Sequence, residues 1–199
     1  MRRKAIKADC MTLVIIFGPP AVGKMAVGME LARLTGYKLF HNHMTVDTVM
    51  PLFPVESPSY TKLVQEFRER VFEEFAAHGE RGLIFTFVWV LDDERDRAFV
   101  EKSMRTFTRH GGEVCFVELA ATQAERLRRN ETPLRMTEKR PQRNSAGSRE
   151  FLLDADTRYR MNTSGDFWYA DRHLRIDNTA LEPEEVARQV VEYFRLELV

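Results

Sequence analysis

Residues 18–24 have the types and spacing of a phosphate-binding loop. They read Gly-Pro-Pro-Ala-Val-Gly-Lys, a match to GxxxxGK, whose glycines let successive backbone N–H groups point at phosphate oxygens. A helix directly after the loop would add the positive end of its dipole, and Lys24 would reach the β- and γ-phosphates as a point charge. We therefore expect nucleotide phosphates to bind at Gly18, Pro19, Pro20, Ala21, Val22, Gly23, Lys24 and Met25.

The flanking sequence supports this interpretation. An apolar run at residues 13–17 predicts a strand before the loop, and Val27, Leu31 and Leu34 predict a helix after it. The alternative is a glycine-rich strand-to-helix turn with an incidental lysine, which the agreement of strand, spacing and helix disfavours. One position departs from the pattern, because the residue after the lysine is normally Ser or Thr and binds Mg²⁺, whereas Met25 has no hard oxygen ligand.

An arginine-rich stretch is the second chemical signal. A mobile, basic segment of this kind between a strand and the next helix is typical of a lid, whose guanidinium groups stabilise the charge of phosphoryl transfer. The alternative is a solvated basic loop. A nucleic-acid patch is less favoured, because aromatic residues do not alternate with the arginines. The basic residues are Arg126, Arg128, Arg129, Arg135, Lys139, Arg140 and Arg143.

Two histidines follow the second predicted strand, at the edge of the sheet where open parallel sheets bind ligands. His41 and His43 alternate along an extended chain, and His43 would share a face with Asp47 if a helix begins there. Because its pKa lies near neutrality, His43 could accept a proton from a substrate hydroxyl, with Asp47 beside it. A metal site would need a third ligand, which the sequence does not offer nearby. Local hydrogen bonding or helix capping is an equally weighted alternative.

The end of the third predicted strand has a candidate metal ligand and candidate pocket residues. Asp92 follows an apolar run, and it could hold Mg²⁺ through water or cap the next helix; both options stay open. Trp89, Trp168 and Tyr169 could line an acceptor pocket, although aromatic residues in this setting more often belong to the core.

Composition indicates an ordinary soluble globular protein. The 199 residues are 44% hydrophobic and 30% charged with zero formal net charge, which gives no reason to expect a nucleic acid or a membrane as partner. Cys10 and Cys115 make no disulfide framework, and the basic start precedes only a five-residue apolar run, so we expect a cytoplasmic protein without a signal peptide. Residues 1–11 are expected to be a flexible tail, and Met11 is a candidate for the natural start.

Strand and helix patterns alternate along residues 12–199, which predicts one α/β domain with a parallel, doubly wound sheet. We expect strands at 12–17, 37–40, 83–90, 113–119 and 173–176. Helices are expected at 24–35, from 57 or 59 to 79, from 92 to 110, at 122–130, around 151–159 and from 182. The long helix before Gly79 is expected to bury its stripe Leu63, Phe67, Val71 and Phe75.

With these features the chain resembles the P-loop small-molecule kinases, the group that includes shikimate kinase, gluconate kinase, adenylate-type kinases and chloramphenicol phosphotransferase. The resemblance covers residues 13–194 and is carried by the P-loop, the lid and the closing segment from His173 to Thr179. It implies a P-loop NTPase fold with strand order 2-3-1-4-5, ATP and Mg²⁺ as cofactors, an acceptor region at about 41–80 and a lid at about 130–148.

The resemblance also implies roles for single residues. Arg129 would lie near the adenine base, Arg135 or Arg140 would reach phosphates from the lid, and the turn containing Asn178 and Thr179 would border the base. Shikimate kinases have Asp-x-Asp after the second strand, and here that place reads His41-Asn42-His43. The end of the third strand, Phe85-Thr86-Phe87, lacks the usual Gly or Asp, so shikimate is disfavoured as the acceptor and metal handling is expected to be indirect.

Two functions follow from these features. The favoured one is an ATP-dependent phosphotransferase acting on a hydroxyl of a small molecule, working as a monomer or a homodimer. The alternative is a nucleotide-binding regulatory protein or weak NTPase that has lost the metal ligands, for which Met25 is the main support. The preference between ATP and GTP stays open.

Overall fold

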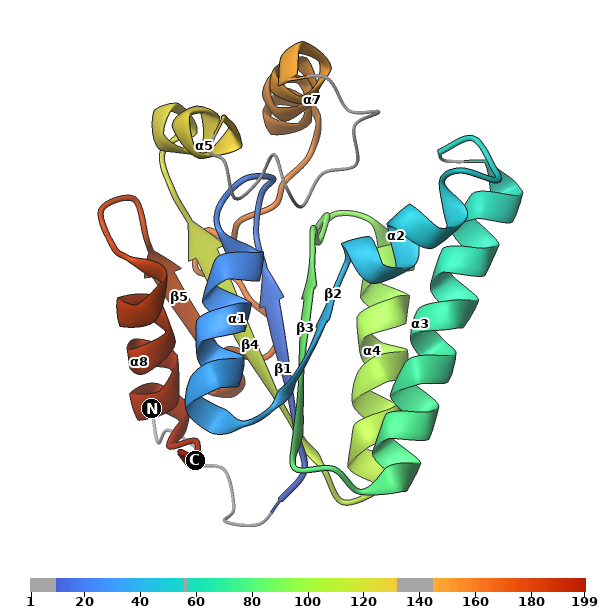
Figure 1. The fold of residues 1–199 in the computed structure, drawn as a ribbon, viewed down its shortest axis with the longest axis vertical. Coiled ribbons are helices and arrows are strands. Elements are labelled where there is room, and N and C mark those ends of the chain that lie inside the picture. The colour runs from blue at the N-terminus through green and yellow to red at the C-terminus, as the bar shows by residue number, and fades with distance from the viewer. Residues whose placement is uncertain (1–9, 56, 132–144) are drawn as a thin grey trace.

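A computed structural model describes residues 10–55, 57–131 and 145–199, which form an open five-stranded parallel sheet with helices on both faces (Figure 1). The strands lie in the order β2-β3-β1-β4-β5, which confirms the expected fold class and strand order. Strand β1 is central and leads directly into the P-loop. The strand bounds are β1 Thr12–Phe17, β2 Lys38–His41, β3 Gly82–Phe87, β4 Glu113–Ala120 and β5 His173–Asp177.

The helices cover the sheet in two layers. Helices α1 and α8 lie side by side on one face, and α3 and α4 cover the other (Figure 1). Helices α5 and α7 lie beyond the carboxyl ends of the strands, above the P-loop (Figure 1). The bounds are α1 Lys24–Thr35, α2 His43–Val49, α3 Pro58–His78, α4 Glu94–Arg109, α5 Gln123–Asn130, α7 Ser145–Arg158, the 3₁₀ turn Ala170–Arg172, and α8 Pro183–Phe194. Within the described ranges, none of these helices is long and apolar enough to cross a membrane.

Two apolar cores pack against the sheet because strand residues alternate between its faces. On β1, Leu13, Ile15 and Phe17 join the core under α3 and α4, whereas Val14 and Ile16 join the core under α1 and α8. All six residues of β1 are fully buried, as expected for the centre of a parallel sheet covered on both sides. This burial holds the first residues of the P-loop at a defined place on the sheet edge.

Helix ends agree with the sequence signals in most places. Gly36 and Gly79 end α1 and α3 in the left-handed conformation, and the side chains of Ser57 and Thr122 cap α3 and α5. Helix α4 differs, because the residue that caps it is Asp93. The capping alternative for Asp92 is therefore wrong.

The expected buried face of α3 is correct only in its second half, where Val71 and Phe75 pack against the core. Leu63 and Phe67 are 38% and 48% exposed, and the fully buried positions are instead Val64, Phe72 and Ala76. Positions 63, 67, 71 and 75 and positions 64, 68, 72 and 76 both repeat every four residues, so periodicity alone could not choose between adjacent stripes of the same helix. The buried stripe contains a charged residue, Arg68, between Val64 and Phe72.

Candidate functional site

The P-loop adopts the backbone conformation that its glycines predict. Gly18 and Gly23 have φ angles of 137° and 102°, and Ala21 is also left-handed at 62°. A Cβ on Gly18 would lie 2.3 Å from the carbonyl oxygen of Leu119, so the loop can pass β4 only with glycine there. Helix α1 begins at Lys24, which places the loop at the positive end of its dipole.

Lys24 folds back over this loop. Its Nζ donates hydrogen bonds to the carbonyl oxygens of Gly18 and Pro19, at 2.7 and 2.8 Å. The ammonium group therefore lies against the segment whose N–H groups would receive phosphate oxygens. A phosphate bound there would meet both the backbone donors and a mobile positive charge.

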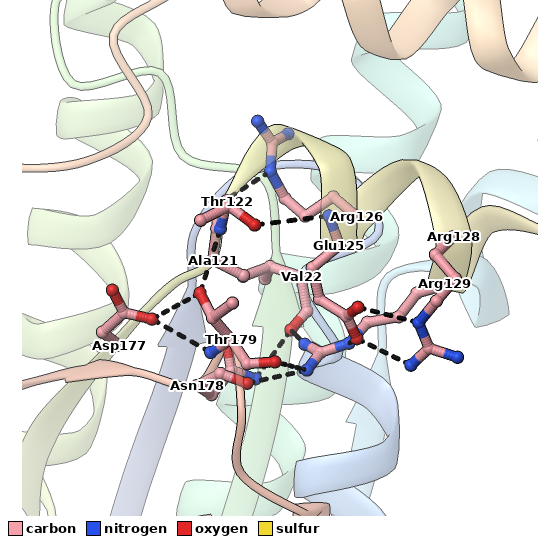
Figure 2. A network of polar contacts seen from close by, with 10 residues as sticks. All are labelled: Val22, Ala121, Thr122, Glu125, Arg126, Arg128, Arg129, Asp177, Asn178 and Thr179. Atoms are coloured by element: carbon pink, nitrogen blue, oxygen red, sulfur yellow. Dashed lines mark hydrogen bonds and ion pairs between the residues drawn. The ribbon is translucent and has the colours of Figure 1, made fainter.

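A polar network joins the P-loop to α5 and to the turn after β5 (Figure 2). Arg129 donates to the carbonyl oxygens of Val22 (3.0 Å) and Asn178 (2.7 Å). Asn178 in turn donates its Nδ2 to the same Val22 oxygen at 2.8 Å, and Thr179 accepts from Arg129 through its carbonyl at 3.3 Å. The structure thus brings Arg129 and Asn178, which are distant in sequence, onto the P-loop, with Thr179 bound to Arg129. The contact of these residues with a base remains a prediction.

Glu125 completes this network on α5. Its carboxylate accepts from both Arg128 and Arg129 at 2.7 Å, and these hydrogen bonds, with that from Arg128 the largest, lower the pKa of Glu125 to about 2. Arg128 projects outward and is exposed, whereas Arg129 is turned toward Val22 (Figure 2). Glu125 therefore orients the guanidinium of Arg129 against the loop.

The arginine-rich stretch divides into two parts. Arg126 is 5% exposed, forms an ion pair of 2.5 Å with Asp156 of α7 and donates to the Pro20 carbonyl at 3.4 Å. The solvated-loop alternative is therefore wrong for Arg126, which links α5, α7 and the P-loop. The candidate lid residues Arg135, Lys139, Arg140 and Arg143 lie outside the described residues.

The segment that contains His41 and His43 lies at the end of β2, two strands away from the P-loop at the end of β1. His41 is the last residue of β2 and pairs with Thr86 of β3, so β2 ends one residue later than predicted. His43 opens α2, and its Nδ1 lies 3.5 Å from Oδ1 of Asp47 one turn later. The predicted shared face of His43 and Asp47 is confirmed, whereas their role toward a substrate remains a prediction. The rings of His41 and His43 lie 6.3 Å apart.

Sequence reasoning missed Arg68, which lies beside this segment. Its guanidinium donates to Oγ1 of Thr45 at 3.2 Å and to Oδ1 of Asn42. It also lies over the rings of Phe85 and Phe99, 5.7 and 5.9 Å from their centroids. Burial lowers the pKa of Arg68 to about 10. An arginine in the middle of the stripe Val64, Phe72, Ala76 was the available signal.

The loop after β3 contains Asp92 and leads to Asp96. Asp92 is exposed, and its Oδ1 accepts from Arg160 at 3.0 Å. Asp96 is the more buried carboxylate, and its Oδ2 accepts from the backbone N–H of Val90 at 2.8 Å. Loss of hydration raises the pKa of Asp96 to about 6. Trp89 is fully buried among Phe17, Phe87 and Phe167, so it belongs to the core and does not line a pocket.

Asp96 predicts a measurable pH dependence of stability. Because its folded pKa is raised above the unfolded value of 3.8, the unfolded state ionises first, and stability falls as pH rises from about 4 to about 6. Asp96→Asn keeps an acceptor for Val90, so we expect it to match the parent near pH 4 and exceed it by up to about 3 kcal/mol near pH 7. Urea unfolding at both pH values measures this difference. An advantage that is equal at both would show that Asp96 titrates normally.

Glu118 is a second functional candidate that sequence reasoning missed. It is 0% exposed on β4, and it accepts from the N–H and the Oγ1 of Thr163 at 2.8 and 2.7 Å and from Nδ2 of Asn162 at 2.9 Å. Burial would raise the pKa of Glu118, but the contacts from His173 and Thr163 outweigh it and hold the pKa below its ordinary value. Glu118 therefore anchors the segment that follows α7 to β4.

The residues near the loop do not fit a protein-bound magnesium ion. Met25 supplies no oxygen, and within the described ranges no group of three or more His, Cys, Asp or Glu side chains could hold a metal ion. The predicted role of Asp92 rests on no contact seen here, and its carboxylate is occupied by Arg160.

No protein-family model matches the sequence, and no curated protein matches it. Solved structures do. A gluconokinase from Sinorhizobium meliloti matches with a TM-score of 0.58 and 13% identity over 95% of this chain and 94% of its own. A sugar kinase from Janibacter sp. matches with a TM-score of 0.58 and 12% identity over 94% and 95%. A shikimate kinase from Acinetobacter baumannii in complex with shikimate matches with a TM-score of 0.54 and 16% identity over 92% and 93%.

The fold is that of the P-loop small-molecule kinases. At these identities the likeness concerns the chain path, and it extends along nearly the whole of both chains. The strand order and the position of the loop after β1 agree with this assignment.

Proposed function

We propose that the protein is an ATP-dependent phosphotransferase that acts on a hydroxyl group of a small molecule. The observation that carries this proposal is the P-loop with Lys24 at the carboxyl end of β1, facing the polar ends of β2 and β3 on the same sheet edge. In a parallel sheet this edge is where ligands bind. The kinase names of the structural neighbours support the same reaction class.

The residues have distinct roles in this proposal. The P-loop amides and Lys24 hold the phosphates of ATP, and Arg129 with Asn178 keeps Val22 in place behind them. The acceptor oxygen attacks the γ-phosphorus as the bond to ADP breaks, and the imidazole of His43 accepts the hydroxyl proton with Asp47 alongside. Arg135 would stabilise transferred charge from the lid. Mg²⁺ bound to the phosphates would neutralise part of their negative charge. The use of ATP favours a location of the protein in the cytoplasm.

A nucleotide-binding regulatory role is the second candidate, and Met25 is the observation that favours it. Without the usual hydroxyl ligand, the loop could bind nucleotide with no need for Mg²⁺ and no transfer. The two candidates differ in whether Mg²⁺ strengthens nucleotide binding and whether ADP forms in the presence of hydroxyl-bearing acceptors.

Thermal unfolding with ATP, ADP or GTP, each with and without Mg²⁺, is the test. We expect ATP to raise the melting temperature with a dependence on its concentration, because a ligand that binds only the folded state stabilises it by mass action. We expect Mg²⁺ to increase this shift, followed by ADP release with a suitable acceptor. A nucleotide-induced rise in melting temperature that does not change with Mg²⁺, without ADP release, would favour the regulatory role. No shift with any nucleotide would refute both.

A further inference from the structure

The outward side of α3 presents apolar side chains to solvent. Leu63 and Phe67 are 38% and 48% exposed, and they lie about one helical turn apart on the same side of the helix. Val71 and Phe75 continue this row and pack against the core under α3 and α4. Helix α3 lies at the outer edge of the molecule, on the side of β2, the last strand of the sheet (Figure 1). Exposed apolar side chains that continue a core-facing row and are bordered by charges are typical of a contact surface.

The apolar row ends in a cavity between α3 and β2. The cavity has a volume of about 660 Å³, and Val71 and Phe75 of α3 and Lys38 of β2 lie in its wall. A space of this size can receive apolar side chains from a second helix. The other lining residues are Arg70, Glu74, Ala77, His78 and Glu80.

A row of charges with alternating sign borders the apolar row. It occupies the position before each apolar residue and reads Lys62, Glu66, Arg70 and Glu74. All four side chains are more than half exposed, and within the helix Lys62 pairs with Glu66 and Arg70 pairs with Glu74. Pairs of this kind stabilise a helix only slightly, so these charges can also pair with a partner.

The charged row is complementary to its own reverse. In two antiparallel copies of α3 related by a two-fold axis, the charged rows lie on the same side of the contact. Position 62 of one copy then faces position 74 of the other, and position 66 faces position 70, because both pairs are symmetric about position 68. Every one of these contacts joins opposite charges, and the axis repeats each of them. A parallel arrangement would bring like charges together at every position. Rows with a spacing of four residues are also the ridges of the commonest class of helix packing.

We propose that the protein forms a two-fold symmetric homodimer in which α3 packs antiparallel against α3 of a second copy. In this dimer Leu63 and Phe67 of each copy enter the cavity lined by Val71 and Phe75 of the other, and the charged rows close the rim. The dimer does not rest on the proposed phosphotransferase activity, because none of these residues belongs to the P-loop or its polar network.

Sedimentation velocity over a concentration series tests this proposal with the full chain. We expect the parent protein to reach twice the monomer mass of 23.2 kDa. Glu66→Lys and Arg70→Glu each place like charges opposite one another at two points of the homodimer, so we expect either change to raise the dissociation constant about 10- to 100-fold. A parent protein that stays monomeric at every concentration would overturn the proposal and leave this face to a different partner.

A mixture of the two variants is the decisive sample. In the heterodimer the introduced lysine of one variant faces the introduced glutamate of the other, and the native Arg70 of the first faces the native Glu66 of the second. Every contact between the rows again joins opposite charges, so we expect the mixture to form a heterodimer with a dissociation constant close to that of the parent. Recovery of this kind also shows that both variants are folded. A mixture that dimerises no better than either variant alone would overturn the antiparallel arrangement.

Matched controls separate this surface from general effects of charge and hydrophobicity. Glu184→Lys on α8 disrupts an exposed pair with Arg188 of the same i,i+4 type, and we expect it to keep the parent dissociation constant. Phe67→Ser should weaken the dimer, whereas Phe151→Ser on α7, where the side chain is 58% exposed, should not. An equal loss of dimer in the controls would overturn the assignment to α3.

Discussion

Replacing Lys24 by alanine is expected to lower phosphoryl transfer about 100- to 1,000-fold and to remove most of the ATP-dependent melting shift. The ammonium group lies against the loop and is the charged donor closest to the expected phosphates, so its loss removes a stabilising contact to charge that develops in the transition state. ADP release with a hydroxyl-bearing acceptor measures transfer, and melting with ATP measures binding.

Lys102→Ala is the matched control for this variant. Lys102 lies on α4, is half-exposed and pairs with Glu69, so its removal changes the same net charge away from the loop. We expect it to retain the parent nucleotide shift. Full ATP turnover in Lys24→Ala, or an equal loss in Lys102→Ala, would show that the loop does not carry the reaction.

Replacing Glu118 by alanine is expected to destabilise the protein by about 3–5 kcal/mol, because this leaves several buried hydrogen-bond donors without their acceptor. His173 Nε2 lies 2.9 Å and Arg175 Nε lies 3.3 Å from its carboxylate oxygens, in addition to the hydrogen bonds from Asn162 and Thr163. The segment after α7 would lose its anchor to β4. Chemical unfolding measures the loss, and faster proteolysis near residues 159–169 would report the release.

The conservative variant and the pH dependence sharpen this prediction. Glu118→Gln keeps an oxygen acceptor for Thr163 but no charge for His173, so we expect a smaller loss. Because the folded pKa of Glu118 is lowered, its contribution is present above the unfolded value of 4.5 and is lost as pH falls through the folded value. Equal stability of Glu118→Ala and Glu184→Ala, an exposed control on α8, would contradict the anchoring role.

The network around Arg129 shows which contacts could be predicted from the sequence and which could not. Arg129, Asn178 and Thr179 were assigned to one site by resemblance, and the structure does bring them together with Val22. Their spacing in the chain carries no such information, since α5 and β5 meet only because β4 and β5 pair in the sheet. Local motif rules do not extend to contacts made by strand pairing across a long connection.

Helix α3 shows a second limit of prediction from the sequence. Its length, capping residue and terminal glycine could be predicted from the sequence, because each depends on residues only a few positions away in the chain. Its most buried stripe could not be predicted, because the neighbouring stripe is the more apolar of the two. The choice depends on tertiary packing, in which Phe72 contacts Phe85 and Phe99. The error concealed Arg68, whose guanidinium packs over Phe85 and Phe99.

The sequence by itself determined the alternation of strands and helices, the P-loop after β1 and the caps that begin and end the helices, because each depends on neighbouring residues and on the period of the backbone. Only the tertiary structure decided the partners of charged side chains: Arg126 with Asp156, Glu118 with Thr163, and Arg68 with Thr45. Desolvation depends on what packs around a group, so the charges that matter for this site became distinguishable only once the helices lay on the sheet.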